Sequence, residues 1–315
     1  MTTVKELFGL PQVIARDMKT AADRQPPDPT LIYGIELEIE CASPDWGDQT
    51  GWSATEDGSL RNDGWEFISN PATFNTLVHR INRFFTNIEG FNPAVYNHYT
   101  ERTSTHVHTN CQDLTLEQLS TILLLYQVTE DLLFKFVGED RADNIFCVPW
   151  SQTQITYRTV SNIKQFISTT SIDRNKYTAL NLVRLRDIGT IEWRHMPGHS
   201  DVFKIEQWLR IIGHYYRIAR LHTLQEVQDK LINLNSSSQY DWLMDWLFKE
   251  QATSLRFIGY RQMLENGVLT MKYSLMDGPS TIKPTLDQRL IEEILQSIQM
   301  ERVRRQEVNT TEGSF

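Results

Sequence analysis

The 315-residue sequence has no apolar run near the roughly 20 residues that a membrane-spanning helix needs. Residues 1–19 also lack the apolar core of a signal peptide. Cysteine is scarce, because Cys41, Cys111 and Cys147 are odd in number, widely spaced and without a CxxC pair. This pattern indicates neither a disulfide framework nor a thiolate zinc site. These absences predict a cytoplasmic protein that makes no use of a membrane.

Positive charge is also in deficit, with 31 Lys and Arg against 40 Asp and Glu and a formal net charge of −9. Such a charge repels phosphate backbones and argues against non-specific nucleic-acid binding as the main task. The sequence contains neither a GxxxxGK[ST] loop nor a strand-linked GxGxxG, which argues against P-loop and Rossmann phosphate sites. What is present is an ordinary globular composition, 40% hydrophobic and 23% charged, sufficient for a sizeable core.

The patterns along the chain divide it into three parts: a helical leader and Pro-rich linker (1–30), a catalytic core (31–200) and a helical C-terminal region packed on the core (201–315). The leader is expected to be helical over 4–22 with an interruption at Pro11. Strands are expected at 31–40, 104–110, 177–185 and 190–196, with hairpin segments bracketed by Gly58 and Gly64. Helices are expected at 74–85, 113–137, 203–221, 240–248 and 286–305, a loop at 233–238 and a frayed tail at 309–315. This order predicts an α+β fold with an antiparallel sheet flanked by helices.

An acidic row occupies the first of these strands. Successive strand side chains point to opposite faces, so Glu36, Glu38 and Glu40 share one face in GIELEIE while the intervening apolar residues face a core. Glutamate has poor strand propensity and aligned like charges repel, so the row is easier to understand if cations occupy it. A solvated outer face is the alternative, and Glu40 fits either a ligand or an edge residue.

Two further strands repeat this construction. In TIEWRH, Glu192 and Arg194 lie on one face, and in STHVHT both His106 and His108 do. Two more polar residues complete the set: Asp57, in a turn signature, and Glu66, between aromatic residues. An Asp in a turn is by default only a turn-forming acid. One antiparallel sheet can gather all of these groups on a single concave surface.

Carboxylate-rich clusters suit hard cations such as Mg²⁺, with Mn²⁺ as a second choice. Magnesium usually binds through a few carboxylates plus substrate phosphates, so the pattern predicts that a nucleoside triphosphate binds together with the metal.

In order, the segments YGIELEIE, EDGSLRNDGWEFISNP, THVHTN, KYTALNL and GTIEWRHMPG resemble the amidoligase family of phages and bacteria, relatives of glutamate-cysteine ligase and glutamine synthetase. The similarity runs from about Tyr33 to Gly198. It implies a glutamine synthetase-like antiparallel sheet forming a cupped active site. It further implies an ATP- and magnesium-dependent ligase that forms a carbon–nitrogen bond through an acyl phosphate. The sequence departs from the family at Trp193, where Phe is common, and in the extra His195 and His199.

The resemblance also assigns roles. The implied magnesium ligands are Glu36, Glu38, Glu66 and Glu192. Arg194 would contact the γ-phosphate, His106 or His108 would lie near nucleotide or acyl phosphate, and Asp57 would bind the amine or a water on the metal. Weaker counterparts, expected to contact substrate or phosphate, are Arg141, Asn144, Lys176, Tyr177 and Asn181.

The substrates are expected to be a carboxylate and an amine, drawn from amino acids, peptides or modified macromolecules, and the oligomeric state is open. Two other functions fit part of the pattern. One is a metal-dependent hydrolase or oxygenase in which His106, His108 and one carboxylate form a facial site. The other is a non-catalytic assembly protein that retains the sheet and uses its C-terminal helices as an interface.

Overall fold

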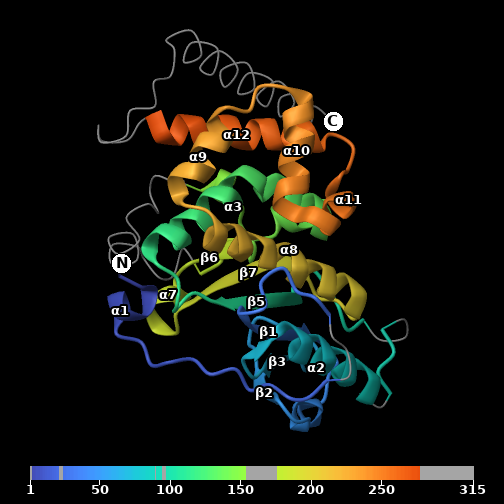
Figure 1. Cartoon of the computed structure of the whole chain (residues 1–315). Coiled ribbons are helices and arrows are strands. Elements are labelled where there is room, and N and C mark those ends of the chain that lie inside the picture. Colours follow the sequence, from blue (N-terminus) through green and yellow to red (C-terminus); the bar gives the residue numbers. More distant parts are fainter. Residues whose placement is uncertain (1, 21–23, 89, 94–96, 154–175, 277–315) are drawn as a thin grey trace, which may run out of the picture.

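The computed structural model describes residues 2–20, 24–88, 90–93, 97–153 and 176–276, and within them the strands form one sheet (Figure 1). Its strands are β1 (Ile32–Ile39), β2 (Trp52–Glu56), β3 (Trp65–Ser69), β4 (Ala72–Thr73), β5 (Ser104–Asn110), β6 (Leu180–Asn181) and β7 (Thr190–Pro197). The strand order is β2-β3-β1-β5-β7-β6, with β4 also paired to β1, and every ladder between these strands is antiparallel. The predicted antiparallel sheet is therefore confirmed.

Helices account for most of the remaining described structure. They are α1 (Val4–Phe8), α2 (Phe74–Asn87), α3 (Leu116–Val137), α7 (Arg184–Asp187), α8 (Val202–Leu221), α9 (Leu224–Ile232), α10 (Ser237–Phe248), α11 (Ala252–Leu255) and α12 (Tyr260–Met276). The described residues also form four 3₁₀ turns, η1 (Pro44–Asp48), η2 (Glu139–Asp143), η3 (Trp150–Gln152) and η4 (Lys249–Gln251). None of these described helices combines the length and apolar character required to span a bilayer.

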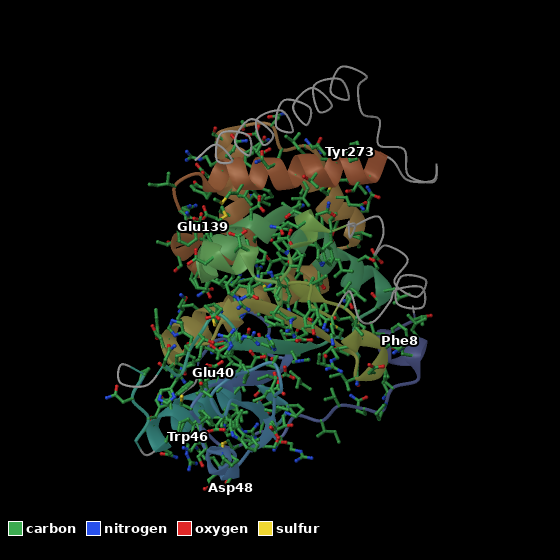
Figure 2. All side chains as sticks on the ribbon, turned by 180° about the vertical axis from the view of Figure 1, so that it is seen from behind. Phe8, Glu40, Trp46, Asp48, Glu139 and Tyr273 are labelled. Atoms are coloured by element: carbon green, nitrogen blue, oxygen red, sulfur yellow. The ribbon has the colours of Figure 1, made fainter. Side chains whose placement is uncertain are left out.

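One face of the sheet is covered by α2, α3 and α8 (Figure 1). Two fully buried aromatic residues show the contact: the Tyr33 hydroxyl of β1 donates to the Leu209 carbonyl of α8, and Trp193 of β7 packs edge-on against Trp208. Helix α12 then packs on the far side of α3. Viewed from behind, Glu40 and Trp46 lie in the half that holds the sheet, whereas Glu139 and Tyr273 lie in the helical half (Figure 2). Glu36 and Glu38 of β1 lie on the opposite sheet face.

Helix α3 is the central helix of this packing. It begins with the predicted capping box, in which Thr115 and Gln118 each accept a hydrogen bond from the other's backbone N–H. Its side chains are buried nearly all round, since it lies between the sheet and α12. Gly267 allows the close approach of α12, because a Cβ at this position would lie only 2.0 Å from the carbonyl oxygen of Val128.

The predicted helix over 4–22 is wrong beyond its first turn. Helix α1 ends where Gly9 adopts a left-handed conformation, with φ of 65°, and the chain from there to residue 20 forms no regular element. The leader instead runs along the core, held by the Val4 amide on the Leu114 carbonyl and the Arg16 amide on the Pro71 carbonyl. Pro11 therefore lies beyond the end of the helix rather than interrupting it.

The predicted strand over 177–185 is also too long. Only Leu180 and Asn181 pair with β7, and α7 follows after two further residues. The Asn181 side chain accepts the Val183 amide and so turns the chain out of the sheet. The other predicted elements agree with the structure to within about four residues. The predicted helix at 286–305 and the tail at 309–315 lie outside the described residues.

Candidate functional site

The acidic row of β1 faces away from the helices, as its alternation predicts. Ile35 and Leu37 are buried against the helices, and Glu36 and Glu38 point to the opposite face. Strand β1 is paired on both sides. Glu38 lies opposite Glu66 of β3, and Glu36 lies opposite His106 of β5. This register brings acids and an imidazole from three strands to one place.

Strand β7 adds the remaining groups. Glu192 lies opposite His108, but the pairing then shifts between Val107 and Thr105. Because Val107 pairs with Trp193 and Thr105 with Met196, two residues of β7 stand opposite one of β5, which is a β-bulge. The two residues are Arg194 and His195, and the guanidinium of Arg194 forms an ion pair with Glu192.

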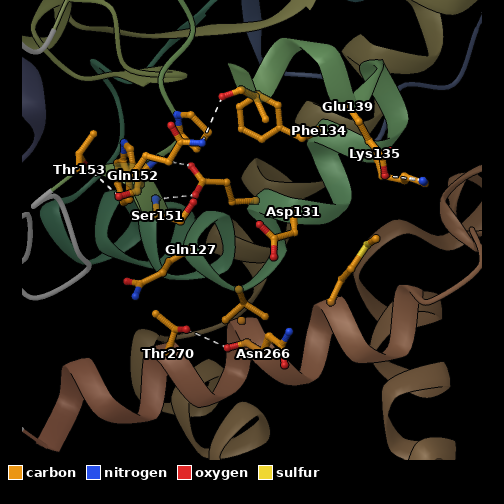
Figure 3. Close-up of a pocket in the computed structure, with 17 residues that line it drawn as sticks. Gln127, Asp131, Phe134, Lys135, Glu139, Ser151, Gln152, Thr153, Asn266 and Thr270 are labelled. Carbon is orange, nitrogen blue, oxygen red and sulfur yellow. Dashed lines mark hydrogen bonds and ion pairs between the residues drawn. The ribbon is translucent and has the colours of Figure 1, made fainter. Parts of the chain in front are cut away.

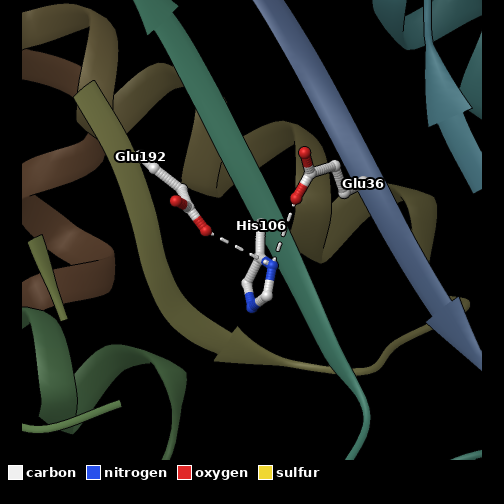
Figure 4. A group of neighbouring side chains, drawn as sticks. All are labelled: Glu36, His106 and Glu192. Atoms are coloured by element: carbon white, nitrogen blue, oxygen red, sulfur yellow. Dashed lines mark hydrogen bonds and ion pairs between the residues drawn. The ribbon is translucent and has the colours of Figure 1, made fainter. Parts of the chain in front are cut away.

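The side chains meet in two overlapping clusters. Glu36, His106 and Glu192 form one, and Glu38, Glu66 and His106 form the other, with the potential ligand atoms of each cluster within 4.8 Å of one another. The Nδ1 atom of His106 lies 3.3 Å from Glu36 Oε2 and 3.6 Å from Glu192 Oε1 (Figure 4). It also lies 3.6 Å from Glu38 Oε1. One N–H cannot neutralise three carboxylates. The structure therefore concentrates negative charge around a single imidazole.

The pKa values record this crowding. Burial raises the pKa of Glu66 to about 9, helped by the neighbouring charges of Glu36 and Glu38. Burial likewise raises the pKa of Glu38. At Glu36 burial acts in the same direction, but the charge of His108 and the hydrogen bond from His106 outweigh it and hold the pKa well below its ordinary value. For Glu192, Arg194 is the main group that overcomes burial and lowers the pKa.

Two side chains hold Glu192 in place. Its Oε2 accepts a 2.6 Å hydrogen bond from Asn181 Nδ2, and its Oε1 accepts one from Arg194. The Arg194 Nε donates to the Phe146 carbonyl at 3.2 Å. His108 is held by Thr190, whose hydroxyl lies 3.0 Å from Nδ1, while its Nε2 lies 3.0 Å from Glu36 Oε1 at an angle unsuited to a hydrogen bond. Thr190 was not predicted, although its position two residues before Glu192 on the same strand face could have indicated it.

Arg141 lies next to the site, and its described contacts are with β7 and with Ser104. Its Nε donates to the His195 carbonyl at 3.1 Å, and its Nη2 donates to the Arg194 carbonyl at 3.0 Å and the Ser104 hydroxyl at 2.9 Å. The side chain is buried, and its pKa is lowered by burial. These bonds satisfy the backbone of the β7 bulge, so Arg141 fixes the segment that carries Arg194.

The other predicted residues are distributed as follows. Asp57 Oδ1 accepts the Ser59 amide at 2.8 Å, the turn-forming arrangement, yet its charge lies close enough to raise the pKa values of Glu38 and Glu66. Lys176 is exposed and its ammonium lies over the ring of Tyr177, 4.8 Å from the centroid. The described contacts of Lys176 and Tyr177 include none of the clustered acids.

Three further polar residues have structural surroundings. Glu40 is fully buried, and its carboxylate accepts bonds from the Arg61 amide and the Asn62 and Thr100 side chains. It is thus neither a member of the clusters nor a solvated edge residue. Asn144 donates to the Glu101 carbonyl at 2.6 Å, in the loop after η2. His195 faces the core, where its Nε2 lies 3.0 Å from the Tyr126 hydroxyl.

A separate cavity of about 580 Å³ lies between α3 and α12, on the helical side of the sheet (Figure 3). Gln127 and Asp131 line it from α3, and Asn266 and Thr270 line it from α12. None of the clustered acids borders it. The acids and histidines singled out in the sequence lie on the sheet face instead.

The donor set of the clusters fits a hard divalent cation. Each cluster offers two carboxylates and one imidazole, a composition that suits Mg²⁺ or Mn²⁺ better than soft metals. The buried Nε2 of His106 has no hydrogen-bond partner among the described residues, so a polar atom in the centre of the site remains to be satisfied. A cation and a bound anion would satisfy both the excess charge and this nitrogen.

The fold and the site together define a protein with a carboxylate-rich centre on the sheet face opposite α2, α3 and α8. The family model described as "Putative amidoligase enzyme" matches residues 42–213, which is more than half of the chain. The chain belongs to this amidoligase family. The matched segment contains Glu66, His106 and Glu192, whereas Glu36 and Glu38 precede it. No curated protein matches the chain.

Proposed function

We propose that this protein is an ATP- and Mg²⁺-dependent ligase that joins a carboxylate to an amine through an acyl phosphate. The convergence of the clustered glutamates and His106 beside Arg194 carries the proposal. Membership of the amidoligase family supports it. The sheet would then be the cupped platform of a glutamine synthetase-like catalytic fold.

The reaction needs an activated carboxylate, because a carboxylate does not condense with an amine at a useful rate. One carboxylate oxygen attacks the γ-phosphorus of ATP, the bond to ADP breaks and an acyl phosphate forms. The amine nitrogen then attacks the carbonyl carbon, phosphate leaves and the nitrogen loses a proton. Phosphoryl transfer depends chiefly on positioning and charge stabilisation, so no protein nucleophile is required.

The proposed roles follow from position and charge. Magnesium would be held by Glu36, Glu38, Glu66 and Glu192, and when bound it neutralises phosphate charge and polarises the transferring group. Arg194 uses Nη1 for Glu192 and Nε for the Phe146 carbonyl, which leaves Nη2 without a partner among the described residues and available to a phosphate oxygen. Asp57 would take the amine proton, because its turn occupies only Oδ1.

The test is whether nucleotide binding depends on the metal. Clustered acids repel a bare triphosphate, and bridging cations reverse the local field. ATP at about 100 times its dissociation constant adds about 2.7 kcal/mol of stability, a rise in melting temperature of a few degrees, and we expect this rise only with Mg²⁺. Glu38→Gln and Glu192→Gln should abolish it, each measured against its own unliganded melt.

Glu56→Gln is the matched control. It removes the same charge from the same sheet, but Thr55 rather than Glu56 pairs with Glu66, so Glu56 faces the other side and is exposed. Its melting shift should equal that of the wild type. Phosphorus NMR with ATP, Mg²⁺ and pooled carboxylates and amines should show release of ADP and phosphate. An equal melting shift in excess chelator would refute the proposed nucleotide site.

The competing hydrolase or oxygenase predicts a different donor set. A facial site of two histidines and one carboxylate would require His106 and His108 to act together. In the described structure each candidate cluster instead contains one histidine and two carboxylates, and His108 contacts Glu36 rather than a shared centre. Iron or zinc at equimolar content in the purified protein would favour this alternative over the ligase.

A further inference from the structure

A second cavity, of about 380 Å³, adjoins the carboxylate clusters on the same sheet face. Glu36 and His108 border it at the end nearest the clusters, and Gly34 of β1 pairs with His108. Its volume falls in the range of about 300–1,000 Å³ typical of small-molecule pockets. Any molecule that fills this cavity reaches the candidate metal ligands directly.

The walls of the cavity are mainly apolar. Ile32 and Ile68 share the strand face of Glu36 and form part of the floor. The apolar side chains of Pro11 and Val13, from the leader, and of Ile188 add to the lining. Such walls favour a ligand with an apolar body.

The polar side chains of the lining already have partners. Gln112 accepts the Val13 amide at 3.0 Å and donates to the Ile188 carbonyl at 3.1 Å. Asn110 accepts the Gln112 amide and donates to Asp113. Little hydrogen-bonding capacity remains to read the polar edge of a nucleobase or the amino group of an α-amino acid. Two carboxylates border the cavity: Glu36, shared with the metal clusters, and Asp187, whose Oδ1 accepts Arg186 Nε at 3.1 Å.

The leader forms a fixed roof. Gln112 holds it at Val13, the Arg16 amide donates to the Pro71 carbonyl at 2.7 Å, and Asp17 accepts the Thr73 amide at 2.8 Å. The leader and Gly34 both precede the segment that the family model matches. The cavity is therefore formed in part by residues that the family match does not include.

We propose that this cavity binds the acyl substrate and selects a monocarboxylic acid with an uncharged, largely apolar body. The carboxylate would lie at Glu36 and His108, where the proposed metal centre neutralises it, and the body would extend towards the leader. This inference rests on the proposed function for its acyl role. An amino-acid substrate fits the cavity less well, because the polar side chains of its walls already have partners and the carboxylate of Asp187 is paired with Arg186.

The probes for the acyl substrate are butanoate, hexanoate and octanoate. Butylamine, hexylamine and octylamine test whether the cavity binds the amine instead, and adenosine tests whether it binds the nucleotide. Binding to the full chain with Mg²⁺ is measured by calorimetry and saturation-transfer NMR. Affinity for the acids should rise about fourfold for each methylene that enters the cavity. A similar rise in the amine series alone, or binding of adenosine that displaces octanoate, would overturn the acyl assignment.

Variants locate the bound acid. A Cβ at Gly34 would meet only His108 Cβ, at 3.7 Å, so Gly34→Ala and Gly34→Val add bulk to the cavity without a backbone clash. We expect Gly34→Val to weaken octanoate at least tenfold and Gly34→Ala to weaken it less. Val13→Ala should weaken octanoate binding several-fold. The matched control is Ile14→Ala, because Ile14 is 73% exposed and lies outside the cavity, and this variant should leave octanoate affinity unchanged.

The melting shift with Mg²⁺ and ATP separates two kinds of failure. If the shift is present but the acids show no dependence on chain length or on the Gly34 and Val13 variants, the cavity assignment is wrong and the ligase proposal stands. If the acids behave as expected but the shift is absent, an apolar-acid pocket exists and the ligase proposal is wrong. Loss of the ATP shift in Gly34→Val with octanoate binding retained would assign the cavity to the nucleotide.

Discussion

Replacing Arg141 tests whether the β7 bulge controls Arg194. In Arg141→Met, the carbonyls of Arg194 and His195 and the Ser104 hydroxyl lose a buried donor. An unsatisfied buried group costs about 1–3 kcal/mol, and relief from burying the guanidinium offsets part of the sum, so we expect a net loss of about 2–4 kcal/mol. At about 2 °C for each kcal/mol in a chain of this size, melting should fall by about 4–8 °C.

Stability alone would not distinguish a positioning role from a structural one. Arg217 is the matched control, because its Nη2 also binds two backbone carbonyls, those of Trp246 and Leu247, in the helical half. Arg217→Met should lower melting without changing turnover, whereas Arg141→Met should lower kcat for ADP formation.

A double-mutant cycle completes this test. Arg194→Lys keeps the charge but loses the planar fork that grips phosphate oxygens, so it should bind nucleotide and turn over slowly. If Arg141 acts through Arg194, the double variant should turn over no more slowly than Arg194→Lys alone. If instead the effects of the two single substitutions on the activation free energy of turnover add to within about 0.5 kcal/mol in the double variant, the two residues act independently and the reasoning is refuted.

Two further predictions concern the core. Burial and the charge of Arg141 lower the pKa of His195 to about 3, so below pH 6.5 the unfolded chain binds a proton that the folded chain does not, and stability falls between pH 6.5 and 3. Between pH 7 and 5 the free energy of unfolding of His195→Phe should fall by about 2 kcal/mol less than that of the wild type, as measured by urea denaturation. Parallel pH profiles of the two proteins would contradict this. Gly267→Ala should lower the melting temperature by several degrees, since its Cβ would overlap the Val128 carbonyl; an unchanged melt would show that α12 shifts freely on α3.

Local patterns predicted the parts of the site that depend on one strand. Alternation in β1 placed Glu36 and Glu38 on one face, and the same rule paired Glu192 with Arg194. The same rule also grouped His106 with His108, but it could not separate them. The register across β1, β5 and β7 makes His106 the centre of both clusters and directs His108 to Glu36 and Thr190.

Other features depend on contacts between distant segments and had no local signal. Glu40 continues the acidic alternation, yet donors from residues 61, 62 and 100 enclose it. Arg141 is 53 residues from the Arg194 carbonyl that it binds. The leader has helical spacing, but Gly9 ends the helix and backbone contacts with the core replace it. Sequence periodicity does not encode such long-range pairs.

The acidic row can exist because the opposite face of β1 compensates for it. Ile35, Leu37 and Ile39 are each at most 1% exposed, and burying such a side chain contributes about 1.5–3 kcal/mol. Two carboxylates about 5 Å apart repel by about 3 kcal/mol at an effective dielectric constant near 20. The apolar ridge therefore outweighs one such repulsion. A one-residue slip would exchange the two faces, so the pairing of β1 with both β3 and β5 fixes the acids in place. The remaining repulsion is energy that a divalent cation would recover on binding, which makes the same strand both a core element and the proposed metal site.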